Sequence, residues 1–238
     1  MNNKSRIAAV FDVDGTLIVG SSLERTFINF LVRHGELRAN ELVRFLGGAF
    51  DGIPLPANKS YLRGKDYYRL SVLARTCFTR EIEPRLLPAA LARIRWHQAS
   101  GHEVALLSGT LDLLLAPLAE RLGIGAASGT HLEMRAQQLS GRITGGHPFG
   151  EGKVERLREL ARRFEFDPRK SFAYADHFAD RHLLERVGYP VAVNPDRELR
   201  RVAETRGWMI EDFTIGTGQL AEVADQRVSE EIAEGARA

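Results

Sequence analysis

The chain has almost no cysteine: its 238 residues include only Cys77. A single cysteine cannot form an intrachain disulfide, and this composition is typical of a reducing compartment. No apolar run approaches the ~20 residues that cross a bilayer, and the apolar stretch near the N-terminus is too short for a signal peptide. We therefore expect a cytoplasmic protein with no membrane partner.

The chain also lacks an excess of charge of either sign. Its 33 Lys and Arg residues nearly balance 31 Asp and Glu residues, which gives a formal net charge of +2. The basic residues are spread along the sequence, so we expect no nucleic-acid partner. The length and the 44% hydrophobic content fit one large globular domain, or one domain that carries an insertion.

Most of the chain alternates between predicted strands and helices. Apolar runs predict strands at residues 7–11, 102–108, 171–176 and 189–193. Apolar residues at helical spacing predict helices at residues 84–100, 111–122, 154–164, 178–187 and 197–206, and residues 131–144 suggest a hairpin. This order predicts an α/β fold, a Rossmann-like parallel sheet with helices on both faces. Ligands bind beyond the carboxyl ends of the strands in such sheets.

The segment 18–83 has no predicted strand. Apolar residues at helical spacing predict helices around 23–31, around 42–49 and over 61–78, and a turn-rich break falls at DGIPLPAN, residues 51–58. We interpret residues 18–83 as an inserted helical cap domain. Residues 1–17 and 84–238 then form the α/β core domain.

Carboxylates follow the predicted strands at one edge of the sheet. FDVDGTL, residues 11–17, places Asp12 and Asp14 directly after the first strand. Asp176 ends a later strand, and Asp180 follows one helical turn further on. Clustered carboxylates without cysteine ligands suit a hard cation such as Mg²⁺, and the cation would relieve the repulsion between the neighbouring aspartates.

Groups that suit a phosphate lie at the same edge. Ser108-Gly109-Thr110 follows the second strand, and Lys153 lies at the start of a predicted helix. Hydroxyls, backbone amides and an ammonium group can hold a phosphoryl group, and an ionised carboxylate can attack it. Two plainer interpretations stay open, in which Ser108 or Thr110 only caps a helix and Lys153 is an ordinary surface lysine.

Four motifs, in order, resemble those of the haloacid-dehalogenase (HAD) superfamily: DVDGT, SGT after an apolar strand, a lone lysine, and ADHFAD. The stretches GEGKVERL and YPVAVNPDRELRRVAETRGW are similar to its phosphoserine-phosphatase-like branch, subfamily IB. The resemblance implies a HAD core with a helical cap. It also implies Mg²⁺-dependent hydrolysis of a small phosphomonoester through an aspartyl-phosphate intermediate.

The resemblance implies roles for the four aspartates. Asp12 would be the nucleophile, and Asp14 would be the general acid for the leaving oxygen and then the base that activates water. The Asp12 carboxylate, the Asp14 main-chain carbonyl and Asp176 would hold Mg²⁺, with Asp180 supporting the site. Dehalogenases of the superfamily generally lack the second aspartate, so Asp14 favours a phosphatase.

The remaining motif residues would bind the phosphoryl group. The resemblance implies that Ser108 and the Gly109 amide hold it, while Lys153 neutralises its charge and orients Asp12. The partner would be a small phosphorylated metabolite. The protein itself would be a monomer or a homodimer.

The chain departs from the family pattern at four positions, one of which is His177, where a small residue is common. Ala175 replaces a glycine before the first aspartate of the last motif, and Ala179 replaces an asparagine before the second. Ser21 stands where phosphoserine phosphatases carry a glutamate, thought to bind the substrate amine. Two alternatives therefore stay open. One is phosphotransfer to an acceptor other than water, and the other is a catalytically weak protein that only binds a phosphorylated ligand.

Overall fold

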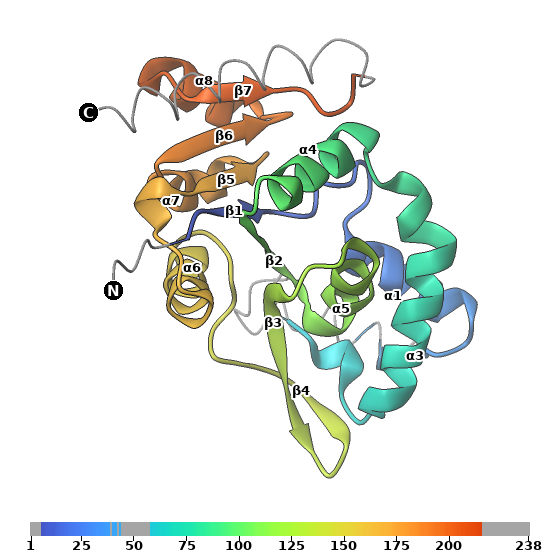
Figure 1. The fold of residues 1–238 in the computed structure, drawn as a ribbon. Coiled ribbons are helices and arrows are strands. Elements are labelled where there is room, and N and C mark those ends of the chain that lie inside the picture. The colour runs from blue at the N-terminus through green and yellow to red at the C-terminus, as the bar shows by residue number, and fades with distance from the viewer. Residues whose placement is uncertain (1–5, 39, 42, 44–57, 216–238) are drawn as a thin grey trace.

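One mainly parallel sheet forms the centre of the molecule (Figure 1). The structure, a computed structural model, describes residues 6–38, 40–41, 43 and 58–215. The sheet has the order β4-β3-β2-β1-β5-β6-β7. Its strands are β1 (Ala8–Phe11), β2 (Glu103–Leu111), β3 (Ala126–Arg135), β4 (Gln138–Thr144), β5 (Phe172–Ala175), β6 (Tyr189–Val193) and β7 (Met209–Glu211).

Every neighbouring pair of strands is parallel except β3 and β4, which form an antiparallel hairpin. The helices are α1 (Leu23–Arg33), α3 (Tyr67–Cys77), α4 (Pro88–Ala99), α5 (Asp112–Leu122), α6 (Glu151–Phe164), α7 (Arg181–Leu184) and α8 (Arg197–Arg206). Shorter helical turns span Ser60–Leu62, Phe78–Ile82, Glu83–Arg85, Pro168–Lys170 and Phe178–Asp180. Among the described helices, none is long and apolar enough to cross a bilayer.

Helices cover both faces of the sheet. Alternate residues of each strand face opposite sides, so each face packs against its own layer of helices. Ala9 and Phe11 of β1 belong to one core, which also holds apolar residues of α1, α3, α4 and α5. Ala8 and Val10 belong to a second core, with apolar residues of α6, α7 and α8. The predicted α/β architecture is confirmed.

Some predicted boundaries in the core were wrong. Residues 178–187 form a short turn and the four-residue helix α7 instead of one helix. The strand predicted over 102–108 continues to Leu111 as β2, because its polar end pairs with β3. The edge strand β7 was missed, since three residues give too little pattern.

The inserted segment leaves and rejoins the core at one place. The Leu87 amide donates to the Leu17 carbonyl (2.9 Å), and Ile18 forms an antiparallel bridge with Leu86. The cap boundaries 18–83 stay a prediction. The helix expected around 42–49 and most of the break at 51–58 lie outside the described residues.

The helix predicted over residues 61–78 begins later, at Tyr67. Gly64 has φ +78°, which ends the preceding turn, and the Asp66 carboxylate then caps α3 by accepting from the Arg69 amide (2.7 Å). Residues 60–62 form a separate turn. The start of α3 is therefore set by a glycine and an N-cap aspartate, and the apolar residues before them do not extend the helix.

An aromatic layer joins the two strands that lead to Asp12 and Asp176. Phe11 of β1 stacks on Tyr174 of β5, with ring centroids 4.3 Å apart and planes 5° apart. The Tyr174 hydroxyl lies 2.8 Å from Nε2 of His97, a fully buried residue of α4. Burial lowers the pKa of His97 to about 2, so its ring stays neutral. The layer holds Asp12 and Asp176, each one residue beyond its strand, in register.

We predict that Tyr174→Phe lowers the free energy of unfolding by about 1–3 kcal/mol, because the stacked ring remains but buried His97 loses a hydrogen-bond partner. Urea denaturation measures the change. Tyr68→Phe is the control, since the Tyr68 side chain is exposed (64%). Equal effects of the two substitutions would contradict this account of the layer.

Candidate active site

Lys153 joins two aspartates in the interior. Its Nζ lies 2.7 Å from Oδ1 of Asp12 and 2.7 Å from Oδ2 of Asp180. All three residues are buried, with exposed fractions of 3%, 5% and 4% for Lys153, Asp12 and Asp180. The lysine is therefore not a surface residue. Its neighbouring carboxylates raise its pKa and keep it charged, although burial opposes this.

Lys153 lies in the first turn of α6, which follows Gly150 (φ +55°). A cation at a helix N-terminus is unfavourable by itself, because the helix dipole is positive there. The two carboxylates more than offset this cost.

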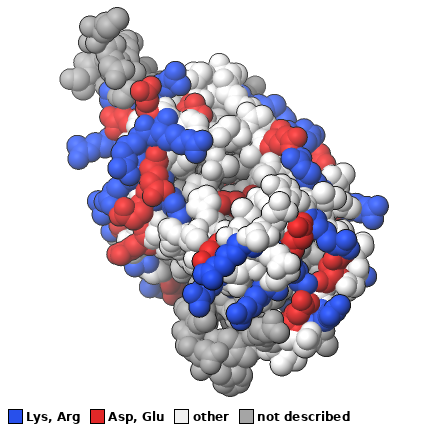
Figure 2. Space-filling view, turned by 90° about the horizontal axis from the view of Figure 1, so that it is seen from below, with Lys and Arg blue, Asp and Glu red and all other residues white. Residues whose placement is uncertain are grey.

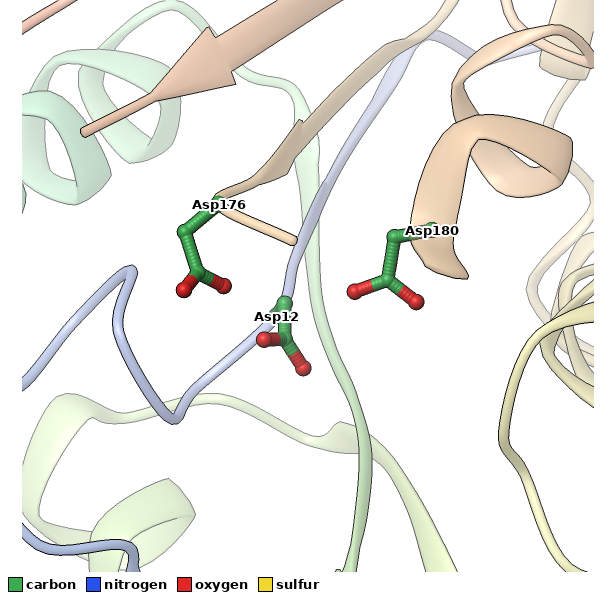
Figure 3. Close-up of side chains that lie close together, drawn as sticks. All are labelled: Asp12, Asp176 and Asp180. Carbon is green, nitrogen blue, oxygen red and sulfur yellow. The ribbon is translucent and has the colours of Figure 1, made fainter. Parts of the chain in front are cut away.

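A third aspartate completes an acidic group. Ligand oxygens of Asp12, Asp176 and Asp180 all lie within 4.8 Å of one another, and Figure 3 shows the carboxylates of the three side chains gathered in one place. Burial raises the pKa of Asp12 from 3.8 to about 8, in spite of the opposing charge of Lys153. Burial likewise raises the pKa of Asp176 to about 6. The ammonium group of Lys153 bonds to two of these three carboxylates, so the acidic group has more carboxylates than ammonium groups bonded to it.

This donor set fits Mg²⁺, because every donor is an oxygen and the local charge is negative. The expected ligands Asp12 and Asp176 belong to the acidic group. Asp180, expected only to support the site, has a ligand oxygen within the same group.

Gly15 allows Asp176 to approach the first motif. Its φ is +85°, and a Cβ at this position would lie 2.0 Å from Oδ2 of Asp176. The hydroxyl of buried Thr16 also lies 3.5 Å from Oδ1 of Asp176. The turn DGT thus brings the Asp176 carboxylate against the backbone that follows Asp12.

The side chain of Asp14 bonds to the inserted segment. Its Oδ1 accepts from the Leu23 amide (2.8 Å), in the first turn of α1. Burial raises the pKa of Asp14, and the charge of Glu24 adds to this effect. Asp12 and Asp14 are therefore two residues apart in the sequence but have different partners.

The predicted phosphate-binding turn lies at the end of β2. Ser108 is buried, and its Oγ accepts from the Thr110 amide (3.2 Å). Neither hydroxyl caps α5, whose N-cap is Leu111 and lacks a side-chain cap. Within the described part of the chain, the buried Thr110 hydroxyl has no hydrogen-bond partner. Ser108 is thus held in place while its own proton remains available.

The two alanine substitutions of the last motif leave the acidic group intact. Ala175 is fully buried as the last residue of β5, and Ala179 lies in the turn that carries Asp180. Asp180 still reaches Lys153. His177 is the N-cap of this turn, and its Nδ1 accepts a hydrogen bond from the Ala179 amide (3.0 Å). The His177 side chain therefore has a structural role.

Sequence reasoning missed residues that surround this centre. Lys59 forms an ion pair with Glu24 (2.6 Å), and the Tyr61 hydroxyl donates to Glu24 (2.7 Å). His147 lies beside the turn of motif two, because a Cβ on Gly109 would be 3.4 Å from its Cε1. No local pattern predicts these contacts, since each joins segments that are far apart in the chain.

The face of the molecule seen from below is hollowed near its centre, and acidic atoms lie within the hollow (Figure 2). Residues without formal charge surround it. Basic and acidic residues are mixed around the rim of this face.

We predict that Gly15→Ala abolishes the stabilisation of the protein by Mg²⁺. The new Cβ would collide with the Asp176 carboxylate in a left-handed backbone conformation, at a cost of about 2–5 kcal/mol. Differential scanning fluorimetry with Mg²⁺ and with EDTA measures both effects. Gly101→Ala is the matched control, since Gly101 has φ +74° and nothing within 4 Å of an added Cβ. A Gly15 variant that responds to Mg²⁺ as Gly101→Ala does would contradict the prediction.

Comparison with known proteins shows the family of this chain. Residues 9–185 match the family described as haloacid dehalogenase-like hydrolase. The chain is 32% identical over 219 residues to phosphoserine phosphatase SerB1 of Mycobacterium tuberculosis, covering 87% of this chain and 71% of that protein. It is 30% identical over 218 residues to a histidinol-phosphatase of Neisseria meningitidis serogroup C, covering 86% and 98%.

A solved structure from Bordetella pertussis Tohama I, of a protein with unknown function, is 28% identical. It aligns with a TM-score of 0.77 and covers 88% of this chain and 100% of that one. The family match covers most of the chain, and relatives at least 30% identical agree with it. The chain belongs to the haloacid dehalogenase-like hydrolases, in their phosphoserine-phosphatase-like branch.

Proposed function

We propose that the protein is a Mg²⁺-dependent phosphatase that hydrolyses a small phosphomonoester through an aspartyl-phosphate. Family membership and relatives named as phosphatases support a phosphoric monoester hydrolase. One observation carries the proposal. Asp12 is buried at the end of β1, bonded to Lys153 and close to two further carboxylates.

Asp12 is the nucleophile. One of its carboxylate oxygens attacks phosphorus, and the bond from phosphorus to the leaving alcohol breaks. The 2.7 Å bond from Lys153 to Oδ1 fixes the orientation of the carboxylate. The same ammonium group balances negative charge on the phosphoryl oxygens, which is the main electrostatic demand of this reaction.

Asp14 exchanges protons with the leaving group and with water. The raised pKa of its carboxyl group favours the protonated form that a general acid needs. It gives its proton to the departing alkoxide oxygen. The resulting carboxylate then takes a proton from the water that attacks the aspartyl-phosphate, which releases inorganic phosphate and restores both aspartates.

Ser108 and the Gly109 amide hold the phosphoryl group during both steps. The Ser108 hydroxyl already accepts from Thr110, so its own proton can be donated to a phosphoryl oxygen. The neighbouring backbone amides are further donors for the charge that develops in the transition state.

Asp12 and Asp176, with the main-chain carbonyl of Asp14, would hold Mg²⁺, and Asp180 would support them. When bound, the cation would lower the pKa of Asp12 and neutralise charge on the phosphoryl group. The raised pKa values of Asp12 and Asp176 support this assignment, since buried carboxylates that lack a cation favour protonation.

The substrate that fits this proposal is a small phosphorylated metabolite. The two relatives are named for phosphoserine and for histidinol phosphate, which are both phosphate esters of amino alcohols. These two compounds therefore belong in any substrate panel. A monomeric or homodimeric cytoplasmic protein stays a prediction.

We predict that Asp12→Asn lowers phosphate release by at least about 10³-fold, because an amide is a poor nucleophile and the covalent intermediate cannot form. A panel of small phosphomonoesters, assayed with Mg²⁺ and with EDTA, measures the loss. Release by the wild type should stop in EDTA.

Asp167→Asn is the matched control. Asp167 Oδ1 accepts from the Arg169 amide (2.9 Å), and an asparagine keeps this bond. Turnover by Asp12→Asn at a rate near that of the control would remove Asp12 as the nucleophile. Transfer of phosphate to an added alcohol, in place of water, would instead favour the phosphotransferase alternative.

We predict that Mg²⁺ stabilises the protein more at high pH than at low pH. The pKa of Asp12 rises on folding from 3.8 to about 8, and that of Asp176 rises to about 6. At a pH between the unfolded and the folded pKa, the native state holds protons that the unfolded chain has released. The free energy of unfolding of the metal-free protein therefore falls as pH rises through this range. A cation must displace these protons, and its affinity therefore increases over the same range.

Melting temperatures are measured in EDTA and in Mg²⁺, at about pH 5.5 and at about pH 8. The increment at each pH is the rise in melting temperature that Mg²⁺ causes. The increment should be larger at the higher pH, and Asp12→Asn should reduce the difference. An increment that is independent of pH would show that these carboxyl groups do not exchange protons for the cation.

A further inference from the structure

We propose that Thr130 and His147 are positioning residues that orient the Ser108 hydroxyl toward the phosphoryl group through one chain of hydrogen bonds. The inference rests on the proposed function, because it names how that site holds its phosphoryl ligand. The chain runs from His147 to Thr130, through the peptide group between Gly109 and Thr110, and on to Ser108. Each link is a contact between groups of the described residues.

The direction of the first link follows from Thr130. Its Oγ1 lies 2.7 Å from the Gly109 carbonyl oxygen and 2.9 Å from Nδ1 of His147. A carbonyl oxygen can only accept, so the single Thr130 proton goes to Gly109. His147 must then donate from Nδ1, and its neutral ring carries its proton on that nitrogen.

The second link crosses a peptide group. The Gly109 carbonyl and the Thr110 amide belong to the same planar unit, so fixing one end fixes the other. The Thr110 amide donates to Ser108 Oγ (3.2 Å). This bond occupies a lone pair of Ser108 and directs its proton elsewhere. Among the described residues, the Ser108 proton has no acceptor of its own.

All the bonds in this chain point the same way, from His147 to Ser108. Hydrogen bonds aligned in this manner polarise one another, and they act on buried groups where the local dielectric is low. Thr130 is fully buried and Ser108 is 2% exposed. The chain therefore makes Ser108 a better-placed and slightly stronger donor to an anion.

The position of His147 is itself determined by the loop before α6. A Cβ on Gly152 would lie 2.3 Å from the His147 carbonyl oxygen, so the glycine lets the loop fold back on the first helical turn. The Phe149 amide also donates to the His147 carbonyl (2.8 Å). The same loop leads into Lys153, and thus one segment supplies both the ammonium group and the start of the hydrogen-bond chain.

Two cations lie near His147: Lys59, from the inserted segment, and Lys153, from the first turn of α6. Burial, and after it the charges of Lys59 and Lys153, lower the pKa of His147 to about 4. The ring is therefore neutral at neutral pH. This agrees with the single ring proton on Nδ1 that the geometry requires.

A double-mutant cycle tests the proposal. Thr130→Val removes the hydroxyl while keeping the side-chain shape, and it should lower kcat/KM roughly three- to tenfold. In the Ser108→Ala background the same substitution should change kcat/KM by less than about twofold, because the group on which the chain acts is gone. An equal factor in both backgrounds would overturn the proposal, since a purely structural role of Thr130 does not require Ser108.

Two variants separate this role from a general loss of packing. Thr130→Ser restores the hydroxyl and should recover most of the loss. Thr205→Val is the matched control, because the Thr205 hydroxyl donates to a backbone carbonyl (2.8 Å from the Arg201 oxygen) on the exposed face of α8. No recovery by Thr130→Ser would also overturn the proposal.

A spectroscopic measurement keeps this test independent of turnover. ¹⁵N NMR of the histidine rings, with His147→Gln to assign the signal, reads which nitrogen of His147 carries the proton near pH 7. Protonation of Nδ1 supports the chain even if no phosphomonoester in the panel is hydrolysed, which would count against the proposed function alone. A proton on Nε2, with Nδ1 bare, would overturn the chain while leaving the phosphatase proposal intact.

Discussion

The buried ammonium group of Lys153, shared between Asp12 and Asp180, is the interaction on which the site depends. Removing ions from water costs several kcal/mol for each ion, and the cost is recovered only where the geometry of the pair is good. Both bonds here measure 2.7 Å. Asp176 adds a third carboxylate, whose pKa is raised by burial and by the neighbouring charge of Asp180. The excess of carboxylates over cations explains why the site suits a metal cation.

This arrangement requires the backbone to come unusually close to polar groups at two glycines. A Cβ on Gly15 would lie 2.0 Å from the Asp176 carboxylate, and a Cβ on Gly152 would lie 2.3 Å from the His147 carbonyl. The first glycine joins the motifs that carry Asp12 and Asp176. The second folds the loop that presents Lys153. Glycine in these motifs is thus explained by close approach, and at Gly15 also by a positive φ.

The sequence predicted the centre of the site because parallel strands end at one edge of a sheet. Asp12 follows β1 and Asp176 follows β5, and these strands are neighbours. Other features had no such rule. The contact of His147 with Thr130 joins a loop to a strand, and the turn before α3 depended on Gly64 and Asp66 outweighing an apolar pattern. Periodicity predicts which face of an element is buried, but it does not predict which distant polar groups meet.

Asp12 and Asp14 show how one short motif gives two carboxylates different partners. Asp12 bonds directly to an ammonium group, which opposes the effect of burial on its pKa. Asp14 bonds to the Leu23 amide of the inserted segment. Burial raises the pKa of Asp14, the Leu23 bond opposes this shift, and the charge of Glu24 adds to it. Glu24 in turn is paired with Lys59 and Tyr61, so its position is set by the cap segment. The proton affinity of the predicted general acid therefore depends on the inserted segment as well as on the core, and a movement of that segment would change acid catalysis as well as access to the site.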